Sequence, residues 1–129
     1  MRWLIDASNV IGTRPDGWWR DRDAAARRLV EAVRHWAAST GEEATVVLDA
    51  GPDGLLGEAG GVTVVRAPRR GRDAADDEIV ALLAAAAEPG RVRVVTSDRA
   101  LIDRARSLGA EVEGAGAFRR RLALAESTI

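Results

Sequence analysis

The segment VRVVTSD, residues 92–98, decides the fold class, because it passes from a strand pattern to the start of a helix. Its β-branched run, residues 92–96, predicts a strand that is buried on both faces. Ser97 or Asp98 then predicts the N-cap of a helix. The apolar stripe of that helix contains Leu101, Ile102, Ala105 and Leu108. A strand that leads directly into a helix is the building unit of parallel α/β sheets.

The same alternation of strands and helices continues on both sides of this segment. Apolar, β-branched runs predict further strands at residues 3–5, 45–48 and 62–65, and a short one at 111–113. Helical periodicity predicts helices over residues 23–39 and 73–88, and a last helix around Phe118 and Leu122. The helix ends are expected at Gly41, Pro89-Gly90 and Gly109.

The remaining segments, residues 7–22 and 50–61, are expected to be loops because glycine and proline interrupt them. We therefore predict an α/β fold with three layers, α/β/α, around a central, mostly parallel sheet of four to five strands. The length of the chain and the absence of a long linker predict a single domain over residues 1–129.

The composition excludes several kinds of chemistry. The 129 residues include no cysteine and no lysine, and the formal net charge is −1. Disulfides, thiolate zinc sites and cysteine nucleophiles are excluded, as are a Walker-type phosphate loop and a Schiff-base lysine. With a net charge near zero, any binding of nucleic acid must come from a local patch. No apolar run reaches the length of a membrane span, so we expect a cytoplasmic protein with no membrane partner.

Acidic residues follow three of the predicted strands. Asp6 ends the first, Asp49 follows the second, and Asp98 comes just after the strand at 92–96. Ligands of parallel sheets bind beyond the carboxyl ends of the strands, which all lie at one edge. One aspartate at such a position means little, because Asp is a common turn and cap residue. Three at one edge indicate a functional site.

The helix predicted from residue 73 brings Asp73, Asp76 and Asp77 to the same edge, because crossover helices run antiparallel to the strands. Acids also stabilise helix N-termini without any other function. Asp76 lies one turn before the apolar stripe that includes Ile79, so its side chain is predicted to face the sheet. Asp77 is offset by one position and is the second choice. Asp103 is expected to lie in solvent.

Crowded carboxylates raise one another's pKa unless a cation neutralises them. A site made only of oxygen ligands favours Mg²⁺ or Mn²⁺ over zinc. Such an ion activates water, and a pair of ions clamps both the attacking and the leaving oxygen of a phosphodiester. The predicted cluster therefore indicates metal-dependent cleavage of a phosphodiester, with one ion or two.

Four segments, in this order, resemble the NYN domain of the PIN-like ribonuclease superfamily and, within it, the bacterial YacP-like branch. They read DASNV at 6–10, VLDA at 47–50, DAADDEI at 73–79 and VVTSDRA at 94–100. The resemblance covers nearly the whole chain. It implies a PIN-like fold and an endoribonuclease that uses Mg²⁺ or Mn²⁺. It also implies that structured RNA is a substrate, that the protein associates with ribosomal material, and that it forms a homodimer.

Carried over by position, the resemblance assigns the catalytic metal site to Asp6, Asp76 and Asp98, and we add Asp77 as a further ligand. The residues expected around these acids are Asn9, Asp49, Thr96 and Ser97. Ser8 and Ser97 are not expected to be nucleophiles, because no histidine is placed to activate them.

Two groups of residues outside the acids are candidates for contact with RNA. Arg66, Arg69, Arg70 and Arg72 are predicted to bind phosphate, the alternative being a solvated loop that offsets the acids. Trp18 and Trp19 either stack on bases or pack their loop onto the sheet. Trp3 and Trp36 are expected in the core, whereas His35 and the run Arg119–Arg121 are expected at the surface.

Three other functions remain open. A receiver-like signalling domain would phosphorylate Asp49 near Thr96, but the second acid and the lysine of such a site are absent. A haloacid-dehalogenase-like phosphatase would use Asp6 as nucleophile, but Ser8 stands where its second acid is needed. The third alternative is a catalytically inactive PIN-like module that only binds RNA or acts as a scaffold.

Overall fold

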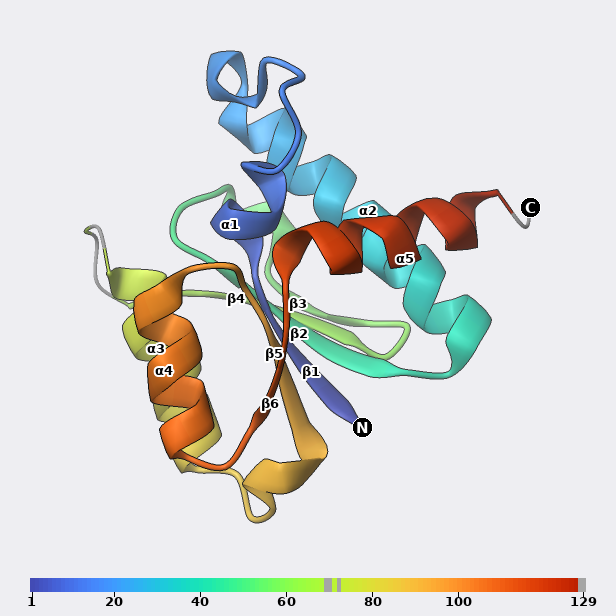
Figure 1. Ribbon diagram of the computed structural model, residues 1–129. Helices are drawn as coiled ribbons and strands as arrows, with labels where there is room; N and C mark the ends of the chain where they lie inside the picture. The colour runs from blue at the N-terminus through green and yellow to red at the C-terminus, as the bar shows by residue number, and fades with distance from the viewer. Residues whose placement is uncertain (69–70, 72, 128–129) are drawn as a thin grey trace.

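The computed structural model describes residues 1–68, 71 and 73–127 (Figure 1). Over these residues the strands are β1 (Arg2–Asp6), β2 (Glu43–Leu48), β3 (Gly57–Ala59), β4 (Val62–Arg66), β5 (Val92–Val95) and β6 (Glu111–Glu113). The α-helices are α1 (Ala7–Ile11), α2 (Arg22–Thr40), α3 (Ala74–Ala84), α4 (Arg99–Ser107) and α5 (Ala115–Glu126). Short 3₁₀ turns are η1 (Trp18–Arg20), η2 (Asp53–Leu55) and η3 (Pro89–Arg91).

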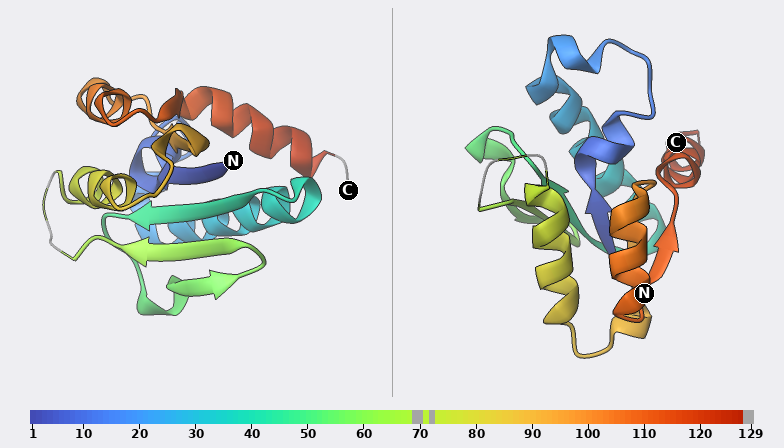
Figure 2. Two further views of the ribbon diagram at one scale, coloured as in Figure 1. Left: turned by 90° about the horizontal axis from the view of Figure 1, so that it is seen from below. Right: turned by 60° about the vertical axis from the view of Figure 1, so that its left-hand side comes forward.

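The six strands form one sheet in the order β3-β4-β2-β1-β5-β6. All neighbouring pairs are parallel except β3 with β4, and the left view of Figure 2 shows β3 pointing against its neighbour. From the central β1 the chain builds β2 and β4 on one side, and then crosses back to build β5 and β6 on the other. This reversal places a topological switch point between β1 and β5, where sheets of this kind bind their ligands.

Helices cover both faces of the sheet. Helices α1, α2 and α5 pack on one face and α3 and α4 on the other, so that the sheet separates two apolar cores (Figure 1). The predicted α/β/α layers and the mostly parallel sheet are therefore confirmed. No helix in the described part of the chain combines the length and the apolar character that a membrane crossing requires.

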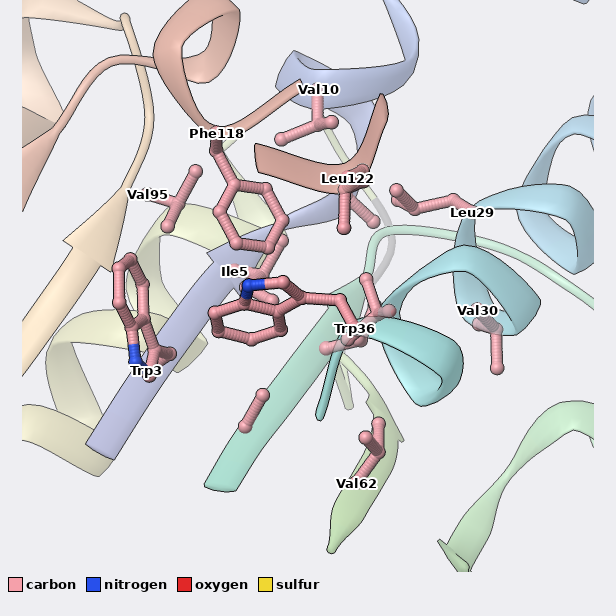
Figure 3. Close-up of a cluster of buried hydrophobic side chains, with 14 of the residues drawn as sticks. Trp3, Ile5, Val10, Leu29, Val30, Trp36, Val62, Val95, Phe118 and Leu122 are labelled. Atoms are coloured by element: carbon pink, nitrogen blue, oxygen red, sulfur yellow. The ribbon is translucent and has the colours of Figure 1, made fainter. Parts of the chain in front are cut away.

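Three aromatic rings hold β1, α2 and α5 together. Trp3 and Trp36 meet edge to face with ring centroids 5.1 Å apart, and Phe118 lies 5.1 Å from Trp36 and 5.7 Å from Trp3 (Figure 3). All three side chains are buried, which confirms the core positions predicted for both tryptophans. Edge-to-face packing adds roughly 0.5–1.5 kcal/mol per pair to the burial of the rings.

Several sequence-based boundaries were wrong. Helix α1 lies within the predicted loop 7–22, and β3 within the predicted loop 50–61, which gives the sheet six strands. Both elements are too short to show a period, and nearby glycines dominate their pattern. Helix α3 ends at Ala84 rather than residue 88. Gly41, by contrast, ends α2 in the left-handed conformation, with φ of 76°.

The helix α5 makes buried contacts that the sequence did not reveal. His35 is half-buried and its Nε2 lies 3.0 Å from the carbonyl oxygen of Ala125. Arg119 is half-buried and donates a hydrogen bond to the carbonyl oxygen of Val10 at 2.9 Å. The guanidinium of Arg121 lies 5.2 Å from the Trp3 ring. The surface positions predicted for His35 and Arg119 were therefore wrong, because α5 packs across α1, α2 and β1, whereas Arg121 is exposed, as predicted.

Replacing Phe118 by alanine tests the aromatic core. The side chain is fully buried between two indoles, so Phe118→Ala should lower the free energy of unfolding by about 3–5 kcal/mol. Leu124→Ala on the same helix is the matched control. Its side chain is 68% exposed, so a change within about 0.5 kcal/mol is expected. Urea unfolding followed by circular dichroism measures both, and equal losses would contradict the assignment of the core.

Candidate active site

A buried carboxylate ends the central strand. Leu4 packs in the core beneath α3 and α4, and Asp6, two residues on, points to the same face of the sheet. The pairing of Ile5 with Val95 places Asp6 beside Thr96. Asp6 is 3% exposed and Thr96 is fully buried, and Thr96 Oγ1 donates a hydrogen bond to Asp6 Oδ2 at 3.0 Å. The sequence therefore places an acid and its hydrogen-bond donor at the switch point.

The residues after β5 connect the elements at this edge through hydrogen bonds. The backbone N–H of Asp98 donates to Thr96 Oγ1 at 3.1 Å, and that of Ser97 donates to Asn9 Oδ1 at 2.8 Å. Ser97 Oγ accepts a hydrogen bond from the N–H of Ala115, the first residue of α5, at 2.9 Å. Asn9, Thr96 and Ser97 thus hold the ends of β1 and β5 against the starts of α4 and α5.

Asp98 begins α4 as its N-cap. Its Oδ1 accepts a hydrogen bond from the backbone N–H of Leu101 at 3.0 Å, and its side chain is exposed at the carboxyl edge. The cap explains the backbone conformation of Asp98 without any ligand. Its carboxylate nevertheless acts on the other acids, since its charge raises the pKa of both Asp6 and Asp76.

Asp76 lies in the first turn of α3, above the buried side chains of Ile79 and Leu83, as its place on the stripe predicts. Burial raises the pKa of this half-buried carboxyl to about 6, and the charges of Asp6 and Asp98 add to the rise. Asp73 raises it further, whereas Arg104 opposes the rise. Acids from β1, α3 and the start of α4 therefore share one electrostatic environment.

Burial also raises the pKa of Asp6, although its hydrogen bonds from Thr96 and Ser8 partly offset this effect. Ser8 Oγ lies 3.4 Å from Asp6 Oδ1, a long hydrogen bond. A hydrogen bond from the backbone of Asn9 lowers the pKa as well, and of the two side-chain partners Thr96 holds its oxygen at the shorter distance.

Asp77 forms an ion pair with a residue of the neighbouring helix. Its Oδ1 lies 3.0 Å from Arg104 Nη1, in an ion pair that joins α3 to α4. Arg104 also lies near enough to lower the pKa of Asp76. Arg104 could not be predicted from the sequence, since only the packing of α3 beside α4 brings it to the acids. Asp103 is exposed, as predicted.

Asp49 lies beside the other acids at the end of β2 rather than among them. It is exposed, and its Oδ1 accepts a hydrogen bond from the N–H of Ala50 at 2.9 Å. It lines an open hollow of about 660 Å³ together with Arg66. The guanidinium of Arg66 is paired with Asp53 at 2.7 Å and donates to the carbonyl oxygen of Gly51 at 2.8 Å. The predicted phosphate contacts Arg69, Arg70 and Arg72 lie outside the described residues.

The two loop tryptophans lie on η1, between α1 and α2. Trp18 is half-buried, Trp19 is 54% exposed, and their ring centroids are 5.9 Å apart. Arg22 and Arg20 place guanidinium groups 5.5 Å and 6.0 Å from the centroids of Trp18 and Trp19, respectively. This pair is therefore neither wholly packed onto the sheet nor wholly in solvent.

The comparison with known families agrees with this arrangement. The family model of the YacP-like NYN domain matches residues 3–129. The chain belongs to the YacP-like NYN domain family. The family membership predicted from four short segments is thus confirmed, and the NYN domain here has the nuclease-like fold of its family.

Two crystal structures of Rae1 (YacP) from Bacillus subtilis share the fold. One, of a mutant form, has a TM-score of 0.78 at 21% sequence identity, and covers 98% of this chain and 77% of that chain. The other has a TM-score of 0.75 at 20% identity, and covers 99% of this chain and 76% of that chain. A search of curated proteins gave no match.

The acids of this NYN domain offer a cation oxygen ligands, but not a complete set. Over residues 1–68, 71 and 73–127, no group of three or more His, Cys, Asp or Glu side chains lies close enough to hold a metal ion. Asp6 and Asp98 nevertheless act on Asp76 electrostatically, since their charges raise its pKa. Such a site fits Mg²⁺, which usually takes one or two carboxylates and keeps several waters.

The hydroxyl of Thr96 can be tested by substitution. Thr96→Val removes the donor to Asp6 Oδ2 and leaves a buried carboxylate unsatisfied, so the free energy of unfolding should fall by about 1–3 kcal/mol at neutral pH. The pKa of Asp6 should rise further, which carboxyl carbon NMR would show. Thr96→Ser keeps the hydroxyl and should retain most of the stability. Equal losses in both variants would show that the methyl group, not the hydrogen bond, matters.

The raised pKa of Asp76 predicts how stability depends on pH. The folded protein binds this proton more tightly than the unfolded chain, so the stabilisation is full below about pH 4 and is lost as the pH rises through about 6. Asp76→Asn removes that dependence. In chelator at about pH 7, it should raise the free energy of unfolding by on the order of 1 kcal/mol, allowing for solvent screening.

Urea titrations between about pH 4 and pH 8 measure this effect, and Asp103→Asn serves as the matched control. Asp103 is an exposed acid on α4, so its replacement should leave the pH profile unchanged. If Asp76→Asn kept the slope of the wild-type protein, the electrostatic coupling of the acids would be refuted.

Proposed function

We propose that this NYN domain is a metal-dependent ribonuclease that cleaves RNA phosphodiester bonds internally at the carboxyl edge of its sheet. The observation that carries the proposal is the arrangement of three acids at this edge: Asp6 ends β1, Asp76 lies in the first turn of α3, and Asp98 caps α4. Three acids from separate elements act on one another at the switch point, the position where such sheets bind ligands. The nuclease-like fold of the family supports the same function.

Asp6, Asp76 and Asp98 would hold Mg²⁺ or Mn²⁺ between them, one or two by direct ligation and the rest through waters of the ion, with Asp77 beside them. Their carboxylate oxygens are the ligands that these hard cations prefer, and water and substrate phosphate would complete the shell. A bound cation would also reverse the repulsion that raises the pKa of Asp76. When bound, the ion supplies Lewis-acid chemistry and lowers the pKa of a bound water.

The protein's own residues would orient this site. Thr96 Oγ1 fixes Asp6 Oδ2 and leaves Oδ1 with a long contact to Ser8, so that Oδ1 is the oxygen directed at a ligand. The ion pair of Arg104 with Asp77 holds the first turn of α3 against α4 and keeps positive charge near the RNA phosphates. Arg66 lies in a surface ion pair, worth at most about 1 kcal/mol, which a phosphate would readily displace.

The remaining predictions concern the partners and the location of the protein. Contact with structured RNA, association with ribosomal material and homodimer formation stay predictions of the family resemblance, and a cytoplasmic location stays a prediction from the sequence. Arg66, Trp18 and Trp19 are the described side chains outside the acids that would contact the RNA. Asp49 and Asn9 would border the path of the strand.

A second candidate function is RNA binding without catalysis. It is favoured by the absence of a group of three close metal-ligand side chains in the described ranges of the chain. The receiver-like and phosphatase alternatives have no such support, because the chain belongs to the NYN family.

Cleavage assays separate the two candidates. Labelled structured and single-stranded RNAs are incubated with the protein in Mn²⁺, in Mg²⁺ or in chelator, and we expect internal cleavage only with metal. Asp76→Asn should lower the rate by more than the roughly 10- to 100-fold loss typical of residues that merely support a metal ligand. Asp103→Asn should cleave at the wild-type rate. Undiminished cleavage by Asp76→Asn would refute the site assignment.

Metal binding can be measured without catalysis. Mn²⁺ should raise the melting temperature of the wild-type protein, because the ion binds the folded state. The rise should be smaller in Asp76→Asn and unchanged in Asp103→Asn. Metal stabilisation without cleavage of any RNA would favour the inactive binding module.

A further inference from the structure

A small pocket lies beside the candidate active site, on the other face of the sheet. It has a volume of about 180 Å³ and lies between α1, η1, the first turns of α2 and the end of β2. Its walls are mainly apolar and include Ala7, Ile11, Trp18 and Leu48. Ala7 and Leu48 belong to the core beneath α1 and α2, and Ile11 packs against it. The packed core therefore holds this part of the pocket wall in place.

Two residues of the pocket wall also lie beside the acids. Ser8 and Asp49 line it, and Ser8 Oγ also contacts Asp6 Oδ1 at 3.4 Å. A group held in the pocket therefore lies next to a strand of RNA whose phosphate is at Asp6. The pocket and the acids are separated only by the end of β1 and the start of α1.

Trp18 is the largest side chain of the pocket wall. It is half-buried, and so it offers part of its indole to the pocket while the loop holds it in place. The guanidinium of Arg22 lies 5.5 Å from the centroid of this ring and lines the same pocket. Trp19 does not line the pocket and is mostly in solvent. The two neighbouring tryptophans thus have different surroundings.

We propose that this pocket binds one unpaired base of the RNA, which stacks on Trp18 while Arg22 contacts the adjoining phosphate. The proposal rests on RNA being the substrate. The volume is below the roughly 300 Å³ of pockets for drug-sized ligands. It is close to the ~150 Å³ of a cavity that encloses one benzene ring. A single ring system is therefore the ligand that fits.

This pocket restricts the class of RNA. A base within a duplex is stacked on both sides, whereas a base in a loop, bulge or single strand can turn outward onto an aromatic side chain. The nucleotide next to the bound phosphate must therefore be unpaired, even when the RNA is otherwise structured. Stacking on an indole tolerates any base, so the pocket selects unpaired nucleotides more than a particular sequence.

Binding measured without catalysis tests the proposal. Fluorescence anisotropy of short single-stranded RNAs in chelator is compared for the wild-type protein, Trp18→Leu, Trp18→Phe and Trp19→Leu. Trp18→Leu should weaken binding by about tenfold, within the range expected for the loss of one stacked base. Trp18→Phe should recover most of the affinity, which controls for folding, and Trp19→Leu should lose less than Trp18→Leu.

RNAs with a single abasic position locate the stacked base. Moved along the strand, the abasic site should weaken wild-type binding most at one position, and the same site should cost Trp18→Leu nothing more, since its contact is already gone. A loss at that position that is unchanged in Trp18→Leu would overturn the pocket. Equal losses of RNA affinity in Trp18→Leu and Trp19→Leu would also overturn the pocket, because they would indicate that the two rings form one exposed stacking surface.

The outcome also separates this proposal from the proposed nuclease. RNA binding that does not depend on Trp18, together with metal-dependent cleavage, would refute the pocket and leave the nuclease intact. Trp18-dependent binding without cleavage in any metal would support the pocket and refute the nuclease. No binding of any RNA, together with no cleavage in any metal, would refute both.

Discussion

The hydrogen bond from Thr96 Oγ1 to Asp6 Oδ2 is the interaction on which the carboxyl edge of the sheet depends. A carboxylate as buried as that of Asp6 loses hydration worth several kcal/mol, and the neighbouring acids add repulsion rather than relief. Thr96 supplies a donor where no cation of the described chain is paired with Asp6. The same hydroxyl accepts the N–H of Asp98, so one side chain fixes the end of β1 and the start of α4 together.

The charges around this bond are arranged so that the acids are only partly compensated. Arg104 is an opposing charge that acts on Asp76, yet its ion pair is with Asp77, and Asp76 keeps a raised pKa in spite of it. An arrangement built for stability alone would place the guanidinium on the carboxyl whose pKa is most raised. Among the described residues this compensation is incomplete, which is consistent with the cation site that we propose at this edge.

Much of the fold and of the acidic edge could be predicted from the sequence, because these features depend on short-range patterns. The strands, the long helices and the placement of Asp6, Asp76 and Asp98 at one edge follow from hydrophobic periodicity and from the antiparallel course of crossover helices. The features that were not predicted depend on tertiary contacts. Short α1 and β3 have no period of their own, Arg104 meets the acids only because α3 and α4 are neighbours, and His35 is covered by α5.

The short helix α1 explains why the two proposed sites are neighbours without being the same site. Instead of entering a crossover helix directly, the chain after β1 remains at the carboxyl edge through α1 and η1 before α2 begins. Asp6 points toward α3 and α4, whereas the pocket of Trp18 lies over the core of α1 and α2. A bound RNA strand would therefore cross the sheet edge at β1, with its phosphate on the acidic face and its base on the other. A nucleotide that crosses the edge in this way cannot be base-paired. The proposed arrangement therefore requires unpaired RNA.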